Sequence, residues 1–113
     1  MVAQINILGV PVHAVTVAEA VARVETLVAG GGTHQIVTLN PEYLYRAQRE
    51  PDLLRIARDA ALVTADGVGI LWAAAVCGYR LPERVTGIDL LVALCARAAT
   101  EGWRVFFLGG RPG

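Results

Sequence analysis

Leu62-Val63-Thr64-Ala65-Asp66-Gly67-Val68-Gly69 is the stretch of sequence that decides the expected fold. The apolar residues at its start are typical of a buried strand, which breaks at Asp66-Gly67. Small and apolar residues then continue to Cys77, as in a buried helix. In an open parallel α/β sheet, ligands bind at the carboxyl ends of the strands. We expect Asp66 to be a functional residue, because a carboxylate between two apolar elements is costly to bury without a partner or a task.

The composition predicts a single domain with a sheet covered on both faces. The chain has 113 residues, of which 55% are hydrophobic, and its formal net charge is zero. The basic residues are scattered, so no broad nucleic-acid-binding surface is expected. No signal peptide is recognisable in Met1–Leu8. The longest apolar stretch, Val68–Cys77, is much shorter than the ~20 residues that a membrane-spanning helix needs.

Strand and helix patterns alternate along the chain, which predicts an α/β fold with a mostly parallel, Rossmann-like sheet and crossover helices. The expected strands are a bent or divided edge strand over Ile5–Val12, then His34–Leu39, Leu62–Val63 and Trp103–Leu108, the last with the strongest pattern. The expected helices follow a capping box at Thr16–Glu19, the N-cap and proline pair Asn40-Pro41 (with a break at Pro51), Gly67, and a second capping sequence at Thr86–Asp89.

Cysteine and histidine residues are expected to be structural. Cys77 and Cys95 lie in apolar helical patterns without metal-ligand spacing, so we predict that they are reduced and buried. His13 and His34 have no partner at a ligand spacing, and no Asp-x-Asp pair is present. We therefore expect no metal site and no cofactor.

The polar residues of interest gather at the predicted strand ends. If the strands are parallel, their carboxyl ends share one rim, and Arg84 on a connecting segment could reach it. A strand followed by glycines usually leads into a helix N-terminus that binds anions. Because the sequence stops at such a turn, we expect the chain to be the amino-terminal part of a longer protein. The residues at the strand ends are Thr38 and Asn40, Thr64 and Asp66, and Gly109 and Gly110.

Four motifs in order resemble the WecG/TagA/CpsF glycosyltransferase family over nearly the whole chain. They are Thr38-x-Asn40-x-Glu42, Ala65-Asp66-Gly67-x-Gly69, Arg84-Val85-Thr86-Gly87-x-Asp89-Leu90 and Phe107-Leu108-Gly109-Gly110-x-Pro112-Gly113. The resemblance implies inverting transfer of a sugar, typically N-acetylmannosamine, from a UDP-sugar to a polyprenyl-diphosphate-linked acceptor sugar. It also implies a role in bacterial teichoic acid or surface polysaccharide synthesis, at the inner face of the cytoplasmic membrane.

The resemblance assigns roles to individual residues. Asp66 matches the family's proposed catalytic base, and Thr38 and Asn40 match polar residues of its pocket. A positioned carboxylate that takes the acceptor proton can contribute about 10²–10⁴-fold to the rate. The diphosphate leaving group requires positive charge or aligned amides beside it. The expected substrate-binding residues are Arg84, Gly67, Gly109 and Gly110, with Arg111 as a further cation.

Other interpretations remain open. Asp66 could be only the N-cap of the helix that begins at Val68, and Asn40 only the N-cap of the helix that begins at Pro41. The chain could be a nucleotide-binding Rossmann-type module without transferase chemistry, although no Gly-x-Gly-x-x-Gly follows the first strand. It could also be an inactive fragment that self-associates through uncovered apolar surface.

Overall fold

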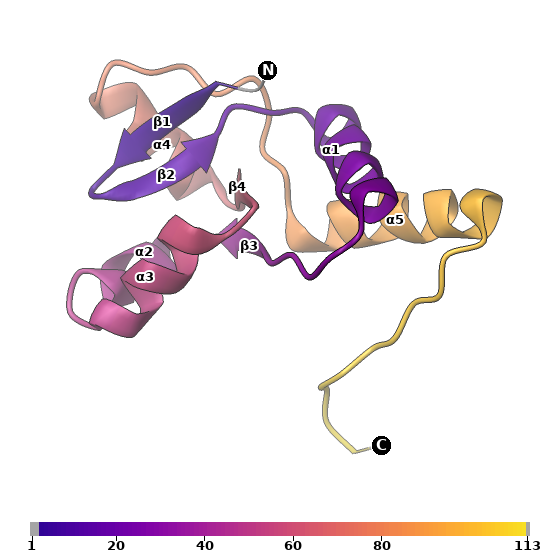
Figure 1. Ribbon diagram of the computed structural model, residues 1–113. Helices are drawn as coiled ribbons and strands as arrows, with labels where there is room; N and C mark the ends of the chain where they lie inside the picture. Colours follow the sequence, from indigo (N-terminus) through magenta and orange to yellow (C-terminus); the bar gives the residue numbers. More distant parts are fainter. Residues whose placement is uncertain (1–2, 113) are drawn as a thin grey trace.

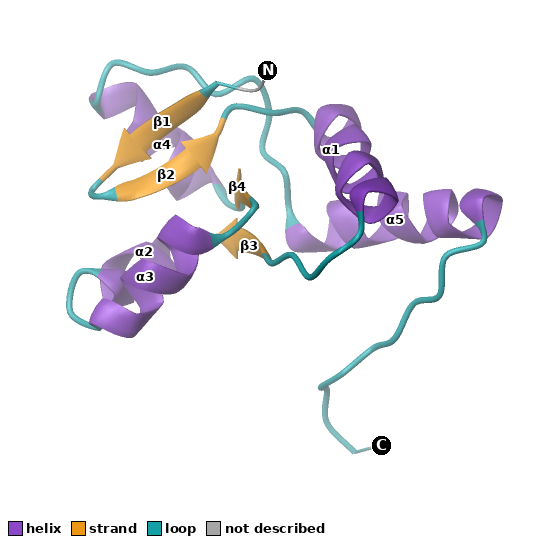
Figure 2. Cartoon of the chain, in the orientation of Figure 1, coloured by secondary structure: helices purple, strands orange, loops and turns teal. Residues whose placement is uncertain are grey.

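The computed structural model describes residues 3–112 and shows a mixed α/β arrangement (Figure 1). Short strands lie near the centre, and helices flank them on both sides (Figure 2). In chain order the elements are β1 (Gln4–Ile7), β2 (Val10–His13), α1 (Val17–Gly30), β3 (Ile36–Leu39), α2 (Pro41–Ala47), α3 (Pro51–Asp59), β4 (Leu62–Ala65), α4 (Val68–Val76) and α5 (Gly87–Glu101).

The strands form two separate pairs. β1 and β2 make an antiparallel hairpin through a turn at Leu8 and Gly9, so the predicted edge strand is two short strands. β3 and β4 are parallel, with Ile36 opposite Leu62 and Leu39 opposite Ala65. The mostly parallel sheet of the prediction is therefore present only as this one pair among the residues that the structure describes.

Each face of the β3–β4 pair has its own apolar core, because side chains alternate across a strand. One core joins the pair to the β1–β2 hairpin and to α2, α3 and α4, and it contains Val37, Leu39, Val63, Ala65, Ile70 and Ala74. The other core joins the pair to α1 and α5, and it contains Ala20, Val21, Val24, Leu62, Val85 and Leu90. All four residues of β4 are buried.

His13 connects the hairpin to the parallel pair. Its Nδ1 accepts a hydrogen bond from the Val63 N–H at 3.0 Å. On the other side of the ring, His13 Nε2 lies 3.1 Å from the side-chain amide nitrogen of Gln4. Burial lowers the pKa of His13 from 6.5. The structural role that we predicted for this histidine fits these contacts.

The helix starts follow the sequence closely. Thr16 Oγ1 accepts the Glu19 N–H, and Glu19 Oε1 accepts the Thr16 N–H, each at 3.1 Å, which confirms the first capping box. At the start of α5, Thr86 Oγ1 accepts the Asp89 N–H at 3.0 Å. Side chains that accept these N–H groups satisfy donors that the helix itself leaves free.

The prediction of a strand over Trp103–Leu108 is wrong. After α5 the chain continues as an extended tail that leads away from the helices (Figure 1). Its apolar side chains are largely exposed, with Phe106 at 85% and Leu108 at 93%. A strand needs hydrogen bonds to a neighbour, and the tail has none to another strand in the described part of the chain.

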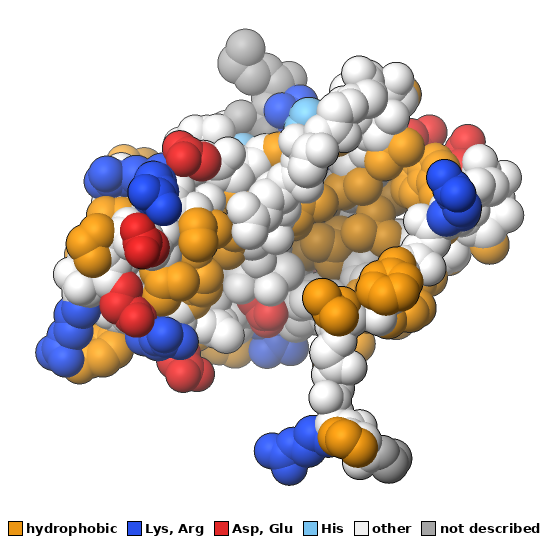
Figure 3. Space-filling view, turned by 60° about the horizontal axis from the view of Figure 1, so that its bottom comes forward, with side chains coloured by type: hydrophobic (Ala, Val, Ile, Leu, Met, Phe, Trp, Pro, Cys, Tyr) orange, Lys and Arg blue, Asp and Glu red, His pale blue; other side chains and the backbone are white. Residues whose placement is uncertain are grey.

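The prediction that both cysteines are buried is also wrong. Cys77 is exposed at the end of α4, and Cys95 is half-buried on α5. Cys95 lines a hollow of about 870 Å³ between α1, α5 and the first residues of the tail. Figure 3 shows hydrophobic side chains gathered in a hollow beside the tail. Neither residue is fully buried, because parts of α4 and α5 have no neighbour among residues 3–112. None of the helices over these residues is long and apolar enough to cross a bilayer.

Candidate active site

The carboxyl ends of β3 and β4, with the residues that follow each strand, form a rim where most of the predicted site residues meet. Thr38 lies opposite Thr64 in the parallel register, so Asn40 and Asp66 are the next opposed pair. The Asp66 N–H donates to the Leu39 carbonyl at 2.8 Å, which holds the two strand ends together just before the loops diverge.

The Asp66 carboxylate lies between the rim and the start of α5. Its Oδ2 accepts a hydrogen bond from the Gly87 N–H at 3.1 Å, and Gly87 is the first residue of that helix. The N-terminus of a helix carries partial positive charge, which attracts a carboxylate. Asp66 is half-buried, and its other oxygen, Oδ1, has no hydrogen bond to a described residue. The carboxylate is thus fixed through one oxygen, and the side chain remains partly accessible to solvent.

The alternative that Asp66 is only the N-cap of the helix that begins at Val68 is wrong. Gly67 is the N-cap of α4, with no side-chain cap hydrogen bond. Asp66 instead satisfies a free N–H of α5, a helix that begins 21 residues later in the sequence. The sequence contained a signal for this contact, since the Thr86 capping pattern predicts where α5 begins, but it does not indicate which carboxylate lies there.

Thr38 lies next to Asp66 at the start of α5. A Cβ placed on Gly87 would stand 3.5 Å from both Thr38 Oγ1 and Asp66 Oδ2, so these two oxygens are less than about 7 Å apart. Thr64 lies on the same face of the pair, and its buried hydroxyl has no partner among residues 3–112. The sequence did not predict that the Gly87 N–H would bond to Asp66, or that the Thr64 hydroxyl would be buried without a partner.

Asn40 has a structural task at the rim. Its Oδ1 accepts the Tyr43 N–H at 2.7 Å and so caps α2, as the pattern Asn40-Pro41 predicts. The residue is exposed, and no hydrogen bond from its side-chain NH₂ group to a described residue is present. The same side chain can therefore cap the helix with its oxygen and donate to a ligand with its nitrogen.

Gly67 and Gly69 allow the loop after β4 to approach the start of α2. Gly67 has φ of 122°, which side chains rarely adopt. A Cβ on Gly69 would stand 2.7 Å from Cγ of Pro41, so any larger residue would push the starts of α2 and α4 apart. These glycines set the shape of the rim.

Arg84 lies near the rim along the backbone. The next residue, Val85, donates its N–H to the Ala65 carbonyl at 2.8 Å, which fixes the connecting segment at the end of β4. The Arg84 side chain is exposed and forms no ion pair with a described residue. It is therefore a nearby cation that is free to move.

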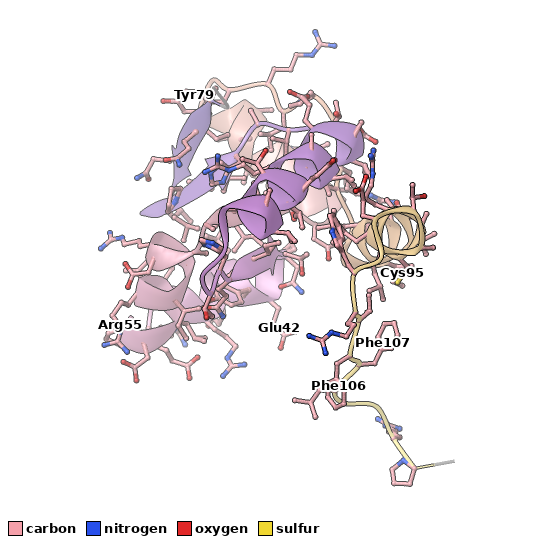
Figure 4. The ribbon with its side chains drawn as sticks, turned by 45° about the vertical axis from the view of Figure 1, so that its right-hand side comes forward. Glu42, Arg55, Tyr79, Cys95, Phe106 and Phe107 are labelled. Atoms are coloured by element: carbon pink, nitrogen blue, oxygen red, sulfur yellow. The ribbon has the colours of Figure 1, made fainter. Side chains whose placement is uncertain are left out.

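Gly109 and Gly110 are not at the rim in this structure. Both belong to the exposed tail, and a Cβ on either would meet nothing within 4 Å. Figure 4 shows Phe106 and Phe107, which precede them, on the tail below α5. Of the predicted site residues, the structure therefore brings together Thr38, Asn40, Asp66 and Gly67, places Arg84 beside them, and leaves Gly109 and Gly110 apart. Over residues 3–112, no three His, Cys, Asp or Glu side chains gather as a metal site would require.

Comparisons with known proteins agree on one family. A family model described as "Glycosyl transferase WecG/TagA/CpsF family" matches residues 5–113. A similar protein from Staphylococcus aureus strain NCTC 8325 is 31% identical over 109 residues, which are 95% of this chain. One from Bacillus spizizenii strain W23 is 34% identical over 74 residues, which are 66% of this chain. Both are named N-acetylglucosaminyldiphosphoundecaprenol N-acetyl-beta-D-mannosaminyltransferase.

The matches cover only part of each relative. The aligned residues amount to 43% of the Staphylococcus aureus protein and 29% of the Bacillus spizizenii protein. The chain therefore spans less than half the length of these curated relatives.

Proposed function

The chain belongs to the WecG/TagA/CpsF glycosyltransferase family, and on that premise we propose that it transfers N-acetylmannosamine from a UDP-sugar to a polyprenyl-diphosphate-linked acceptor sugar. The names of the relatives support this donor sugar and acceptor. The observation that carries the proposal is the Asp66 carboxylate, which lies within a family-matched segment at the carboxyl ends of two parallel strands. The product would serve bacterial teichoic acid or surface polysaccharide synthesis, with the reaction at the inner face of the cytoplasmic membrane.

In this proposal the transfer is inverting and Asp66 is the catalytic base. The acceptor hydroxyl attacks the anomeric carbon, the new glycosidic bond forms, and the bond from that carbon to the UDP oxygen breaks. Asp66 takes the proton of the attacking hydroxyl, and UDP leaves with the electron pair. The anchored Oδ2 and the free Oδ1 support this role, because a general base must present one oxygen in a fixed place.

Thr38 and Asn40 are proposed to position the sugars. The Thr38 hydroxyl is close enough to Asp66 to contact the same substrate group. The Asn40 NH₂ group can donate to a sugar oxygen without loss of the α2 cap. Gly67 lets the loop backbone approach the substrate, and Arg84 is the cation nearest to the rim along the connecting segment, where it would offset the charge of the departing UDP.

The Rossmann-like sheet and the role of Gly109 and Gly110 belong to the same proposal. Only β4 pairs with β3 among residues 3–112, so the other edge of β3 is open to a further strand. If Val105–Leu108 paired in parallel with Ile36–Leu39, Gly109 would come to lie beside Asn40. We place this pairing in the donor-bound enzyme, where the amides of Gly109 and Gly110 would contact the diphosphate.

A second candidate function, a nucleotide-binding module without transfer, is favoured by one observation. Asp66 and Asn40 both make hydrogen bonds that stabilise helix starts, which accounts for their presence without catalysis. The chain would then bind UDP but not turn over the donor.

The test is UDP release from UDP-N-acetylmannosamine with a lipid-linked N-acetylglucosamine acceptor. We expect Asp66→Asn to lower the rate by about 10²–10⁴-fold, because the amide cannot take the proton. Its carbonyl oxygen can still accept the Gly87 N–H, so folding and UDP binding should be preserved. Asp59→Asn, at the exposed end of α3, is the matched control and should leave the rate unchanged.

Each other result has a defined meaning. Turnover by Asp66→Asn at the wild-type rate would reject Asp66 as the base. UDP binding without turnover by the wild type would identify the binding module. No binding and no turnover would identify an inactive fragment.

A further inference from the structure

Gly87 is a glycine that the backbone and its packing do not require. Two common reasons for a glycine are a left-handed backbone and a neighbour too close for a Cβ. Gly67 has the first, with φ of 122°, and Gly69 has the second, with its Cβ position 2.7 Å from Pro41 Cγ. Gly87 has neither, because its φ lies outside the left-handed region and its Cβ position is 3.5 Å from the nearest atoms. That distance is ordinary van der Waals contact.

A glycine at position 87 also lowers the stability of the protein. Glycine gives the unfolded chain extra conformational freedom, so its replacement by alanine stabilises a protein wherever the native backbone permits alanine. Alanine is in addition the better helix former, and Gly87 is the first residue of α5. Folding stability therefore gives no reason for a glycine at this position.

The atoms around the Gly87 Cβ position belong to the candidate active site. The three nearest are Thr38 Oγ1 and Asp66 Oδ2, each at 3.5 Å, and Thr38 Cγ2 at 3.6 Å. We call the position that a Cβ would take, together with its immediate surroundings, the Gly87 space. All three residues are half-buried, so a small group can approach the Gly87 space from solvent. A side chain at position 87 would protrude toward both Thr38 and Asp66.

The charges around the Gly87 space favour a neutral hydroxyl group over an anion. A helix N-terminus often binds an anion, but here the Gly87 N–H already donates to Asp66 Oδ2 at 3.1 Å. The Asp66 carboxylate would also repel a diphosphate. A hydroxyl group can donate its proton to the carboxylate and accept a hydrogen bond from the Thr38 hydroxyl. The Gly87 space therefore suits the acceptor side of the reaction and not the diphosphate of the donor.

We propose that the Gly87 space receives the attacking hydroxyl of the acceptor sugar, and that the absence of a side chain at position 87 lets this hydroxyl reach Asp66. The inference rests on the proposed function, in which Asp66 takes the proton of that hydroxyl. It adds a residue that determines acceptor specificity. A hydroxyl on a sugar ring brings its carbon and the ring with it, so even one methyl group at position 87 competes with the acceptor for the same volume.

The test variant is Gly87→Ala, and its matched control is Gly30→Ala. Each glycine is the terminal residue of a helix and has φ outside the left-handed region, but a Cβ on Gly30 would meet nothing within 4 Å. Alanine at position 87 keeps the N–H that donates to Asp66. The urea midpoints of both variants should therefore equal or exceed that of the wild type.

Two titrations of the full chain separate the acceptor from the donor. One uses a short-chain, water-soluble lipid-linked N-acetylglucosamine diphosphate, and the other uses UDP. We expect Gly87→Ala to bind the acceptor about tenfold more weakly and to lower kcat/KM for the acceptor by about 10–100-fold. Its affinity for UDP should equal that of the wild type. Gly30→Ala should match the wild type in acceptor binding, UDP binding and turnover.

Four results would overturn the proposal. They are wild-type acceptor binding by Gly87→Ala, no acceptor binding by the wild type, an equal loss of UDP affinity in Gly87→Ala, and a urea midpoint of Gly87→Ala below that of the wild type. The last would show that the glycine is needed for packing.

Failure of the proposed function gives a different result. A wild-type chain that binds the acceptor and UDP without turnover would reject transfer, whereas weaker acceptor binding by Gly87→Ala would still support the Gly87 space as the acceptor site. Asp66→Asn should lose turnover and keep acceptor binding, because its side chain still accepts the Gly87 N–H and leaves the Gly87 space open.

Discussion

Leu62–Ala65 and Val105–Leu108 are four-residue segments of similar apolar character with opposite outcomes. The first is β4, in which every residue is at most 2% exposed. The second lies in the tail, where exposure runs from 49% at Val105 to 93% at Leu108. The sequence favoured the second segment as the stronger strand.

The difference between the two segments is their neighbours. β4 has β3 on one edge, the His13 side chain of β2 on its Val63 N–H, and an apolar core on each face. Val105–Leu108 has none of these among residues 3–112. A strand is stabilised by cross-strand pairs and by burial rather than by its own residues, so equal local patterns need not give equal structure.

The largest expected effect comes from truncating one leucine in each segment. Leu62→Ala should destabilise the protein by about 2–5 kcal/mol, because it leaves a cavity in a packed core. Leu108→Ala, the same chemical change in the tail, should stay within about 0.5 kcal/mol. Urea denaturation of the ligand-free protein measures both.

A loss at Leu108 as large as at Leu62 would contradict this expectation. It would mean that the tail already pairs with β3 without the donor. Another result would support the proposed pairing in the donor-bound enzyme. In that case the urea midpoint of Leu108→Ala would equal that of the wild type without UDP and would lie below it with UDP present.

A smaller effect should come from the glycines that follow each segment. Gly69→Ala should cost about 1–3 kcal/mol, because its Cβ would overlap the Pro41 ring and the rim would have to shift. Gly110 has φ of 90°, which side chains rarely adopt, but no contact in the described structure fixes the tail there and nothing lies within 4 Å of an added Cβ. The tail can change its backbone conformation, so Gly110→Ala should stay within about 0.5 kcal/mol. Thermal unfolding of the two variants side by side checks this, and equal shifts would show that the packing at Pro41 is looser than described.

The smallest expected effect is a pH dependence of stability that arises from His13, which contacts β4 and not the tail. Because burial lowers the pKa of His13 below 6.5, the unfolded chain binds this proton more readily than the folded chain. The contribution of His13 to stability should therefore be complete above pH 6.5 and should be lost as the pH falls below it. Urea midpoints measured from pH 7.5 to pH 5 will show this loss in the wild type.

Two variants serve as controls for the histidine prediction. His13→Asn should remove the part of the pH dependence that stems from this ring. His34→Asn should keep it, because His34 is exposed and its ring bonds only the nearby Gly31 carbonyl in the described structure. A pH profile unchanged by His13→Asn would reject the assignment.

Local features of the fold could be predicted because their causes are local. The Thr16–Glu19 capping box and the Asn40-Pro41 helix start each depend on residues within a few positions of one another. The same holds for the end of β4 at Asp66-Gly67. Rim membership of Thr38, Asn40 and Asp66 then followed from the parallel direction of two strands.

The remaining features depend on contacts distant in sequence. No local pattern shows that Asp66 meets Gly87, that His13 meets Val63, or that Gly69 must fit against Pro41. The predictions of a strand in the tail and of two buried cysteines were wrong for the same reason. An apolar segment is stabilised by burial, but only the three-dimensional arrangement shows whether other residues bury it.

The bond between Asp66 and the first amide of α5 has a consequence for the rate of any reaction at the rim. A carboxyl group with both oxygens free rotates about its bond to Cβ and must give up that freedom when a substrate arrives. Here a fifteen-residue helix already fixes the rotation through Oδ2. The entropic cost of orienting Oδ1 is therefore met during folding. In the proposed reaction, each encounter with an acceptor would begin from a preorganised group.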